Sequence, residues 1–249
     1  MTEGFSSACA RNNGRSFLRL HETEIVLVPE FLPGMENKKE RNQLHKTMLR
    51  WKSLASMFSI KFRNMIDLGS FIISFIQSAD YDDIYNEFSL QFELGIFLRL
   101  NLPAGCKVQF ERNTGDLGIR GTIKKEADLI ILDGDDKYSI ELKNPRKGAF
   151  PMRMGQFIED VMFAEQLKGA GFVKTFCLTL VDSGPNRAFY QGDNSAAPYC
   201  YFRENHTGLL HANIRDAQSS KSYEISGHYS IEWTDCDNGR YKYYLLEAK

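Results

Sequence analysis

Several features that would assign the chain to a special class of protein are missing from its sequence. The cysteines are scattered, odd in number and never arranged as CxxC. This pattern argues against a disulfide framework and a zinc site, and it favours a reducing compartment, the cytoplasm. The most apolar window, residues 71–76, is too short to span a membrane. The first 15 residues are polar and lack the apolar core of a signal peptide.

An excess of charge of one sign is missing as well. The chain has 31 Lys and Arg residues against 32 Asp and Glu, for a net charge of −1, so any basic surface for a polyanion must be local. No GxxxxGK[ST] loop occurs, and neither ATP hydrolysis nor a nucleotide cofactor is expected. What remains is the composition of an ordinary globular protein, 43% hydrophobic and 25% charged over 249 residues.

The strongest chemical pattern lies in residues 127–147, which predict two strands joined by a tight turn. Residues 128–132 form a short apolar run that opens with Asp128, as expected of a strand buried on both faces. An Asp-Gly turn follows. Residues 138–143 then alternate, so that Glu141 and Lys143 share one face of the second strand. The hairpin is expected to bring Asp128 beside Glu141, with the ammonium group of Lys143 close by.

Two carboxylates and an ammonium group in one place have a chemical use. Carboxylates at close quarters repel each other unless a cation lies between them, and hard oxygen ligands suit Mg²⁺. Such a metal ion polarises a phosphoryl oxygen and lowers the pKa of a bound water. A neighbouring lysine orients that water or stabilises the charge on phosphorus. The alternative is an exposed hairpin with a Glu–Lys surface pair that contributes little.

Asp128, followed after twelve residues by Glu141-Leu142-Lys143, resembles the D…(D/E)xK signature of the PD-(D/E)xK nuclease superfamily, in particular its restriction-endonuclease branch. Ala127 stands where the family name has a proline, which is not a metal ligand. The resemblance implies an α/β fold with an αβββαβ core and a mixed central sheet. It also implies that Asp128, Glu141 and the Leu142 carbonyl hold Mg²⁺, with Mn²⁺ able to substitute, and that Lys143 positions the attacking water.

A helix is predicted ahead of this core, from about residue 82 to residue 100. One apolar stripe of helical spacing is expected to pack inward: Phe88, Phe92, Ile96 and Leu100. Glu93 lies next to the stripe, where a partly buried carboxylate needs a partner. In the restriction-endonuclease branch a glutamate from this helix often joins the metal site. Glu93 is our candidate for that catalytic role and Glu87 the second choice, while a simple surface acid remains the alternative.

Basic residues flank the acidic hairpin on both sides and are candidate DNA contacts: Arg120, Lys124, Lys125, Arg146, Lys147 and Arg153. Residues 36–63 are predicted to be helical and carry eight Lys and Arg against two Glu. Both sets suit a phosphate-binding surface, and an ordinary solvated surface is the alternative. In the predicted helix 154–167, Gln156 and Asp160 share one face. Some relatives place a glutamine of this helix near the site.

The chain is expected to divide into a mostly helical N-terminal extension (1–79), a catalytic core (80–185) and a β-rich C-terminal extension of the same domain (186–249). The last is expected to contain short aromatic strands at 189–190, 199–202, 223–233 and 241–246, with a hairpin turn at 235–239. The resemblance implies a Mg²⁺-dependent deoxyribonuclease, foremost a type II restriction endonuclease that cuts double-stranded DNA as a homodimer. A structure-specific or repair nuclease and a non-catalytic DNA-binding module on a degenerate nuclease core remain alternatives.

Overall fold

The computed structural model describes residues 19–21, 24–26, 65–145, 148–206, 208–215 and 221–249. The chain forms two units, Met1–Ile66 and Asp67–Lys249. In the first unit, β1 (Arg19–His21) and β2 (Glu24–Val26) pair as an antiparallel ladder. The basic helix predicted for residues 36–63 lies outside the described residues. No helix in the described part of the chain is both long enough and apolar enough to cross a membrane.

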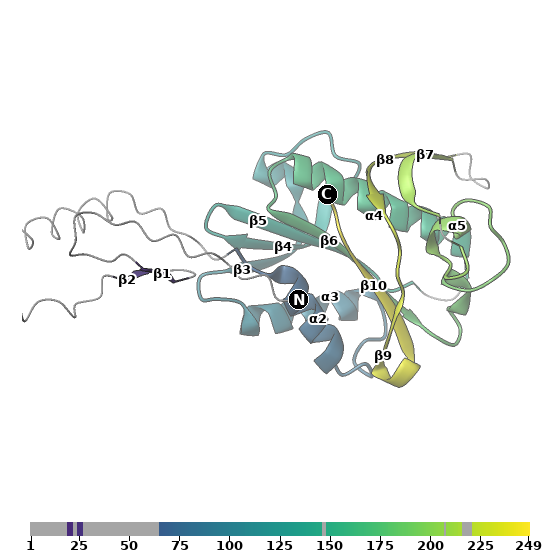
Figure 1. Ribbon diagram of the computed structural model, residues 1–249, viewed down its shortest axis with the longest axis horizontal. Helices are drawn as coiled ribbons and strands as arrows, with labels where there is room; N and C mark the ends of the chain where they lie inside the picture. Colours follow the sequence, from purple (N-terminus) through teal and green to yellow (C-terminus); the bar gives the residue numbers. More distant parts are fainter. Residues whose placement is uncertain (1–18, 22–23, 27–64, 146–147, 207, 216–220) are drawn as a thin grey trace, which may run out of the picture. The chain divides into compact units, whose positions relative to one another are not determined.

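A mixed six-stranded sheet forms the centre of the second unit, with strand order β3-β4-β5-β6-β10-β9 (Figure 1). Its strands are β3 (Lys107–Asn113), β4 (Glu126–Asp133), β5 (Asp136–Lys143), β6 (Lys174–Asp182), β9 (Thr234–Cys236) and β10 (Tyr241–Glu247). Only β5 and β6 run parallel, and α4 (Phe150–Gly169) connects them, as a parallel pair requires. The predicted α/β fold with a mixed central sheet is confirmed.

Helices cover both faces of this sheet (Figure 1). On one face, α2 (Leu68–Ser78) packs against α3 (Glu87–Asn101), and both lie over the sheet. On the other face lies α4. Neighbouring residues of β6 show the two sides, since Phe176 packs against Gly69 of α2 whereas the Thr175 hydroxyl donates to the Ala164 carbonyl of α4. The alternation of side chains along a strand accounts for this two-sided burial.

The orientation of α3 differs from the sequence-based expectation. Phe88, Phe92 and Leu100 are exposed, at 68%, 47% and 78% of their surfaces, so the prediction that their stripe packs inward is wrong. A second stripe with the same spacing, Leu90, Leu94 and Leu98, is fully buried instead. The helix also contacts β3 at Gly95, where a Cβ atom would lie 2.2 Å from the Phe110 ring. Only a glycine allows this close approach, which fixes the face that α3 turns to the sheet.

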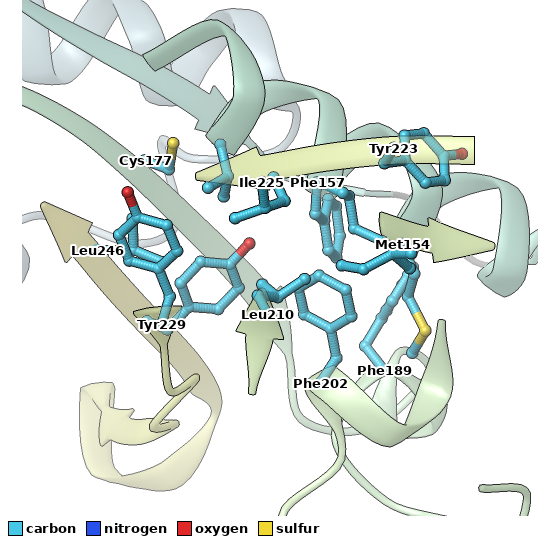
Figure 2. Close-up of a cluster of buried hydrophobic side chains, with 14 of the residues drawn as sticks. Met154, Phe157, Cys177, Phe189, Phe202, Leu210, Tyr223, Ile225, Tyr229 and Leu246 are labelled. Atoms are coloured by element: carbon cyan, nitrogen blue, oxygen red, sulfur yellow. The ribbon is translucent and has the colours of Figure 1, made fainter. Parts of the chain in front are cut away.

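The C-terminal part packs on α4 through a cluster of buried apolar and aromatic side chains (Figure 2). An antiparallel pair, β7 (Leu210–Arg215) and β8 (Ser222–Tyr229), lies against α4. One carboxylate of α4, that of Glu165, accepts hydrogen bonds from the Ser226 and Gly227 amides and the Tyr229 hydroxyl. These bonds fix the β7-β8 pair to the helix.

Two of the short strands expected in this region are helical in the structure. The 3₁₀ turn Arg187–Phe189 includes the first residue of the strand expected at 189–190, and Tyr199–Phe202 is α5. Aromatic residues favour strands only where a neighbouring strand edge is available, and these residues instead wrap around the end of α4 with Phe189 and Phe202 buried. A hairpin turn is present at residues 237–239, but it joins β10 to β9. The strand expected at 223–233 is β8 instead, and it pairs with β7.

Candidate active site

Asp128 and Glu141 lie opposite each other at one end of the β4-β5 hairpin. The antiparallel register pairs Leu129 with Ile140, and one residue further it places Asp128 opposite Glu141. The Leu142 amide donates to Oδ2 of Asp128 at 2.6 Å, which fixes that carboxylate at the end of the ladder. Glu141 is buried, with 1% of its surface exposed. The hairpin therefore brings together the two carboxylates that the sequence singled out.

A third carboxylate and a second lysine join this pair from other elements. Asp160 of α4 is buried, and Lys124, which precedes β4, forms ion pairs with both Glu141 and Asp160. The distance from Lys124 Nζ to Glu141 Oε2 is 2.7 Å. We refer to Asp128, Glu141, Asp160, Lys124 and Lys143 as the acid cluster.

Lys143 connects the acid cluster to α3. Its ammonium group lies 3.2 Å from Glu87 Oε1 and 3.5 Å from Asp160 Oδ2, and it donates to the Leu142 carbonyl at 2.8 Å. The backbone amide of Asn144 donates to Oε2, the other carboxylate oxygen of Glu87, at 3.4 Å. Lys143 thus lies between an acid of α3 and an acid of α4, at the end of the strand that carries it.

Gln91 fixes the other side of the hairpin to α3. Its Nε2 donates to the Asp128 carbonyl and to Glu111 Oε1, each at 2.7 Å. Gln91 is buried, and it lies one helical turn after Glu87, so one face of α3 presents both residues to the sheet. The backbone of Glu111 has a positive φ of 46°, and the register of β3 with β4 would place this residue opposite Asp128.

The glutamate of α3 that contacts the acid cluster is Glu87, and not the first choice, Glu93. The structure joins Glu87, the second choice, to the acid cluster through Lys143. Glu93 is half-buried, and no hydrogen bond or ion pair connects it to the acid cluster within the described residues. Glu93 lies six positions after Glu87, and this spacing places the two glutamates on different faces of one helix.

The predicted DNA-binding residues occupy three kinds of position. Arg120 and Lys125 are exposed in the segment that leads into β4, and half-buried Arg153, in the first turn of α4, donates to Gln156 Oε1 at 3.2 Å. Lys124 instead has its ammonium group inside the acid cluster. The remaining two candidates, Arg146 and Lys147, lie outside the described residues.

Burial and charge shift the pKa values of the acid cluster. Burial raises the pKa of Glu141 to about 8; the Asp128 carboxylate adds to the rise and the Lys124 ammonium opposes it. Burial likewise raises the pKa of Asp160, against the lowering effect of Lys143 and Lys124. For both lysines burial acts to lower the pKa, but the surrounding carboxylates outweigh it and raise the pKa above the ordinary value. Both ammonium groups therefore stay charged at neutral pH.

The donor set fits a divalent cation, although the carboxylates are not arranged as a ready metal site. Among the described residues, no three His, Cys, Asp or Glu side chains converge closely enough to hold a metal ion as they stand, and the Lys124 ammonium lies between Glu141 and Asp160. One oxygen of Glu141, Oε1, is buried and lacks a hydrogen-bond partner in the described part of the chain. A buried carboxylate oxygen without a partner is costly. The oxygen chemistry suits Mg²⁺ or Mn²⁺.

Sequence reasoning missed Asp160, Gln91 and the position of the Lys124 side chain. The signal for Asp160 was its place on the same helix face as Gln156. That spacing indicated a shared face but gave no information about the strand beneath it.

Comparison of the chain with protein-family models, with curated proteins and with solved structures finds no match.

Proposed function

We propose that this protein is a Mg²⁺-dependent endodeoxyribonuclease. The observation that carries the proposal is the convergence of Asp128, Glu141 and Lys143 at one end of the β4-β5 hairpin, with Asp160 from α4 at the same point. Separate elements supply these groups, which is uncommon for a solvated surface pair. Buried carboxylates in mutual contact with two ammonium groups are costly to fold, and such sites are candidates for function.

The order of elements supports the nuclease class. The succession α3, β3, β4, β5, α4, β6 has the αβββαβ order that the PD-(D/E)xK resemblance implies. Asp128 lies in the second strand of this succession, whereas Glu141 and Lys143 lie at the end of the third. The proposal therefore includes a restriction-endonuclease-like core around the acid cluster. Asp128, Glu141 and the Leu142 carbonyl would hold the metal ion, with Asp160 beside them.

The chain's own groups have distinct roles in this proposal. When bound, the metal ion would supply Lewis-acid activation of a phosphoryl oxygen and of a bound water. Lys143 stays protonated, so it stabilises negative charge on the scissile phosphate and does not act as a base. Glu87 and Asp160 hold its ammonium group from two sides. Gln91 holds the backbone at Asp128, so that the carboxylate keeps its direction.

A plasmid-nicking assay tests the proposal. We expect supercoiled DNA to be cut in Mg²⁺ or Mn²⁺, and to be bound without being cut in Ca²⁺. Replacing Glu141 by Gln keeps the shape of the side chain and should reduce cleavage by more than about 100-fold, since even outer partners of metal ligands are worth 10–100-fold. Glu93→Gln is the matched control, because Glu93 has no contact with the acid cluster. Cleavage that persists in EDTA would falsify the metal-dependent mechanism.

Within this class we favour a type II restriction endonuclease, and discrete DNA fragments would single it out from a repair nuclease that cuts at damaged or branched sites. A chain with one acid cluster cuts both strands most simply as a twofold dimer on a near-palindromic sequence. Light scattering of the free and the DNA-bound protein should show a homodimer. A monomer in both states would exclude this arrangement.

One observation favours a second candidate, a DNA-binding module without catalysis. The Lys124 ammonium already neutralises Glu141 and Asp160, as a degenerate site would require. Isothermal titration with Mn²⁺ distinguishes the two candidates. Saturable binding that is lost in Glu141→Gln supports the nuclease. DNA binding without any metal binding supports the module.

A further inference from the structure

A cavity of about 580 Å³ lies beside the acid cluster and has no part in the function proposed above. Its lining comes from four places in the chain: segment 81–85, the residue just after β5, the end of β6 with the segment that follows it, and the start of β10. Its volume lies in the range of small-molecule sites. Asn144, which follows Lys143 in the chain and donates to Glu87, is part of its lining. The cavity therefore begins one residue beyond Lys143 of the acid cluster.

Aromatic rings form much of the cavity wall. The rings of Tyr81 and Tyr241 stack with their centroids 5.0 Å apart and their planes at 29°. The Tyr81 hydroxyl donates to the Ile76 carbonyl at 2.6 Å, which fixes this ring. Tyr85, by contrast, is 62% exposed, and its ring has a free face. Such a ring at a cavity rim is a stacking surface for a planar ligand.

Asn186 adds an unused hydrogen-bond acceptor to the lining. Its side chain is buried, with 4% of its surface exposed, and Oδ1 has no hydrogen-bond partner within the described residues. A buried acceptor without a partner is costly, so a ligand that carries an N–H donor would supply the missing hydrogen bond. The side-chain amide of Asn144, another lining residue, offers a further polar contact.

The charge of the lining disfavours an anionic ligand. Asp82 and Asp182 contribute carboxylates, of which that of Asp82 pairs with Arg240 at 3.1 Å, and the described residues that line the cavity include no Lys, Arg or His. Two acids repel an anion, but they accept hydrogen bonds from amino groups. A ligand that fits is planar, uncharged and rich in N–H donors.

We propose that this cavity receives an unpaired nucleobase of the DNA substrate, one that carries an exocyclic amino group. The inference rests on the proposed function and defines its substrate more narrowly. The base of the nucleotide next to the scissile phosphate leaves the stack and enters the cavity, while its phosphate stays outside. The base stacks on Tyr85, and a rotation of the Asn186 side chain, which lines the cavity, turns its unpaired Oδ1 toward the amino group of the base. Enzymes that accommodate a displaced base recognise it through these two kinds of contact.

The test compares two DNA duplexes of identical sequence, one fully paired and one with a single bulged adenine, bound in Ca²⁺ and measured by fluorescence anisotropy. We expect the bulged duplex to bind more tightly, because its adenine reaches the cavity without the cost of unpairing. Tyr85→Ala should remove this preference. The affinity for the bulged duplex should fall by a factor between about fivefold and about 100-fold, because one base–aromatic stacking interaction is lost. Affinity for the paired duplex should change little.

Phe88→Ala is the matched control. Phe88 is also an exposed aromatic residue of the same region, 68% exposed, and it does not line the cavity, so the preference should persist. Asn186→Leu removes the unpaired acceptor. We expect it to keep or raise the melting temperature of the free protein and to lose the preference for a bulged adenine.

The outcomes separate this inference from the proposed function. Equal binding of the two duplexes by the wild-type protein, together with metal-dependent cleavage, overturns the nucleobase site and leaves the nuclease proposal standing. Loss of the preference in Phe88→Ala to the same degree as in Tyr85→Ala also overturns it. Binding of neither duplex overturns both proposals.

Discussion

The ammonium group of Lys124 lies 2.7 Å from Oε2 of Glu141, and the same group pairs with Asp160. Both acids are almost completely buried, whereas 26% of the Lys124 side chain is exposed. The lysine therefore supplies the positive charge that keeps two buried carboxylates together. A metal ion bound by Glu141 would take over this task, so Lys124 and the metal ion would compete for the same oxygen atoms.

Replacing Lys124 by Met tests this competition. The change leaves Glu141 and Asp160 without their shared counter-charge, and breaking a buried ion pair costs about 3–5 kcal/mol. In EDTA at about pH 9, where Glu141 is ionised in the folded protein, we expect the free energy of unfolding to fall by about 3 kcal/mol. Mg²⁺ should recover most of this loss and should stabilise the variant more than the wild type. Urea unfolding with and without Mg²⁺ measures both effects.

Lys125→Met is the control for that experiment, because Lys125 is the exposed neighbour of Lys124. Its free energy of unfolding should stay within about 0.5 kcal/mol of the wild type. If Lys124→Met proves as stable in EDTA as the wild type, the ion pairs contribute no net stability and the competition does not exist.

The local parts of the site followed from the sequence. The apolar run, the Asp-Gly turn and the alternation up to Lys143 are properties of neighbouring residues, so they predicted the β4-β5 hairpin and the meeting of Asp128 with Glu141. The α/β order of elements followed for the same reason. Periodicity along the chain determines which residues share a face.

The parts of the site that depend on tertiary packing could not be predicted from the sequence. Helix α3 has two apolar stripes of equal spacing, and the close approach of Gly95 to Phe110 favours burial of the one that lies beside this glycine. That choice also turns Glu87, rather than Glu93, toward Lys143. Lys124 looked like a surface base, since the charges of its neighbours carry no information about where its ammonium group points. Asp160 joins the cluster only because α4 crosses over the parallel strands β5 and β6.

The buried carboxyl of Glu141 should make stability depend on pH. Its pKa is raised from 4.5 to about 8, so between these values the folded protein holds a proton that the unfolded chain has released. Folding is then disfavoured increasingly as pH rises through this window, and below pH 4.5 the group is neutral in both states. In EDTA we expect the stability of the wild type relative to Glu141→Gln to decline from about pH 5 to about pH 8. Urea unfolding across this range measures the difference, and parallel curves for the two proteins would contradict the shift.

Asp160 should be needed for cleavage although it lies outside the D…(D/E)xK pattern. It pairs with both ammonium groups of the acid cluster, so Asp160→Asn removes the charge that holds Lys143 toward the scissile phosphate. We expect kcat to fall by about 10–100-fold, as for other residues that orient catalytic groups, with little change in KM. Glu159→Gln is the matched control, since Glu159 is the neighbour of Asp160 on α4 but pairs with Lys221, outside the acid cluster. Equal rates for the two variants would remove Asp160 from the mechanism.

The exposed bases beside the hairpin should determine how DNA affinity depends on salt. Each bound phosphate releases counterions and contributes about −0.9 to the slope of log affinity against log salt. Arg120→Ala with Lys125→Ala should therefore flatten the slope by about 0.9 for each phosphate that is no longer bound and weaken binding to all sequences alike. Lys143→Ala should instead stop cleavage with little change in affinity, because its partners are the acids of the cluster and the scissile phosphate.

A salt titration of DNA binding in Ca²⁺ measures these slopes. Lys137→Ala is the control, since Lys137 lies at the other end of β5, away from Glu141 and Lys143. We expect this variant to keep the wild-type slope. If the double variant also keeps it, Arg120 and Lys125 are solvated surface only, and the phosphate-binding groups of a chain with net charge −1 must be other bases. The basic stretch 36–63 would then be the next to test, because its eight Lys and Arg against two Glu give it a large local excess of positive charge.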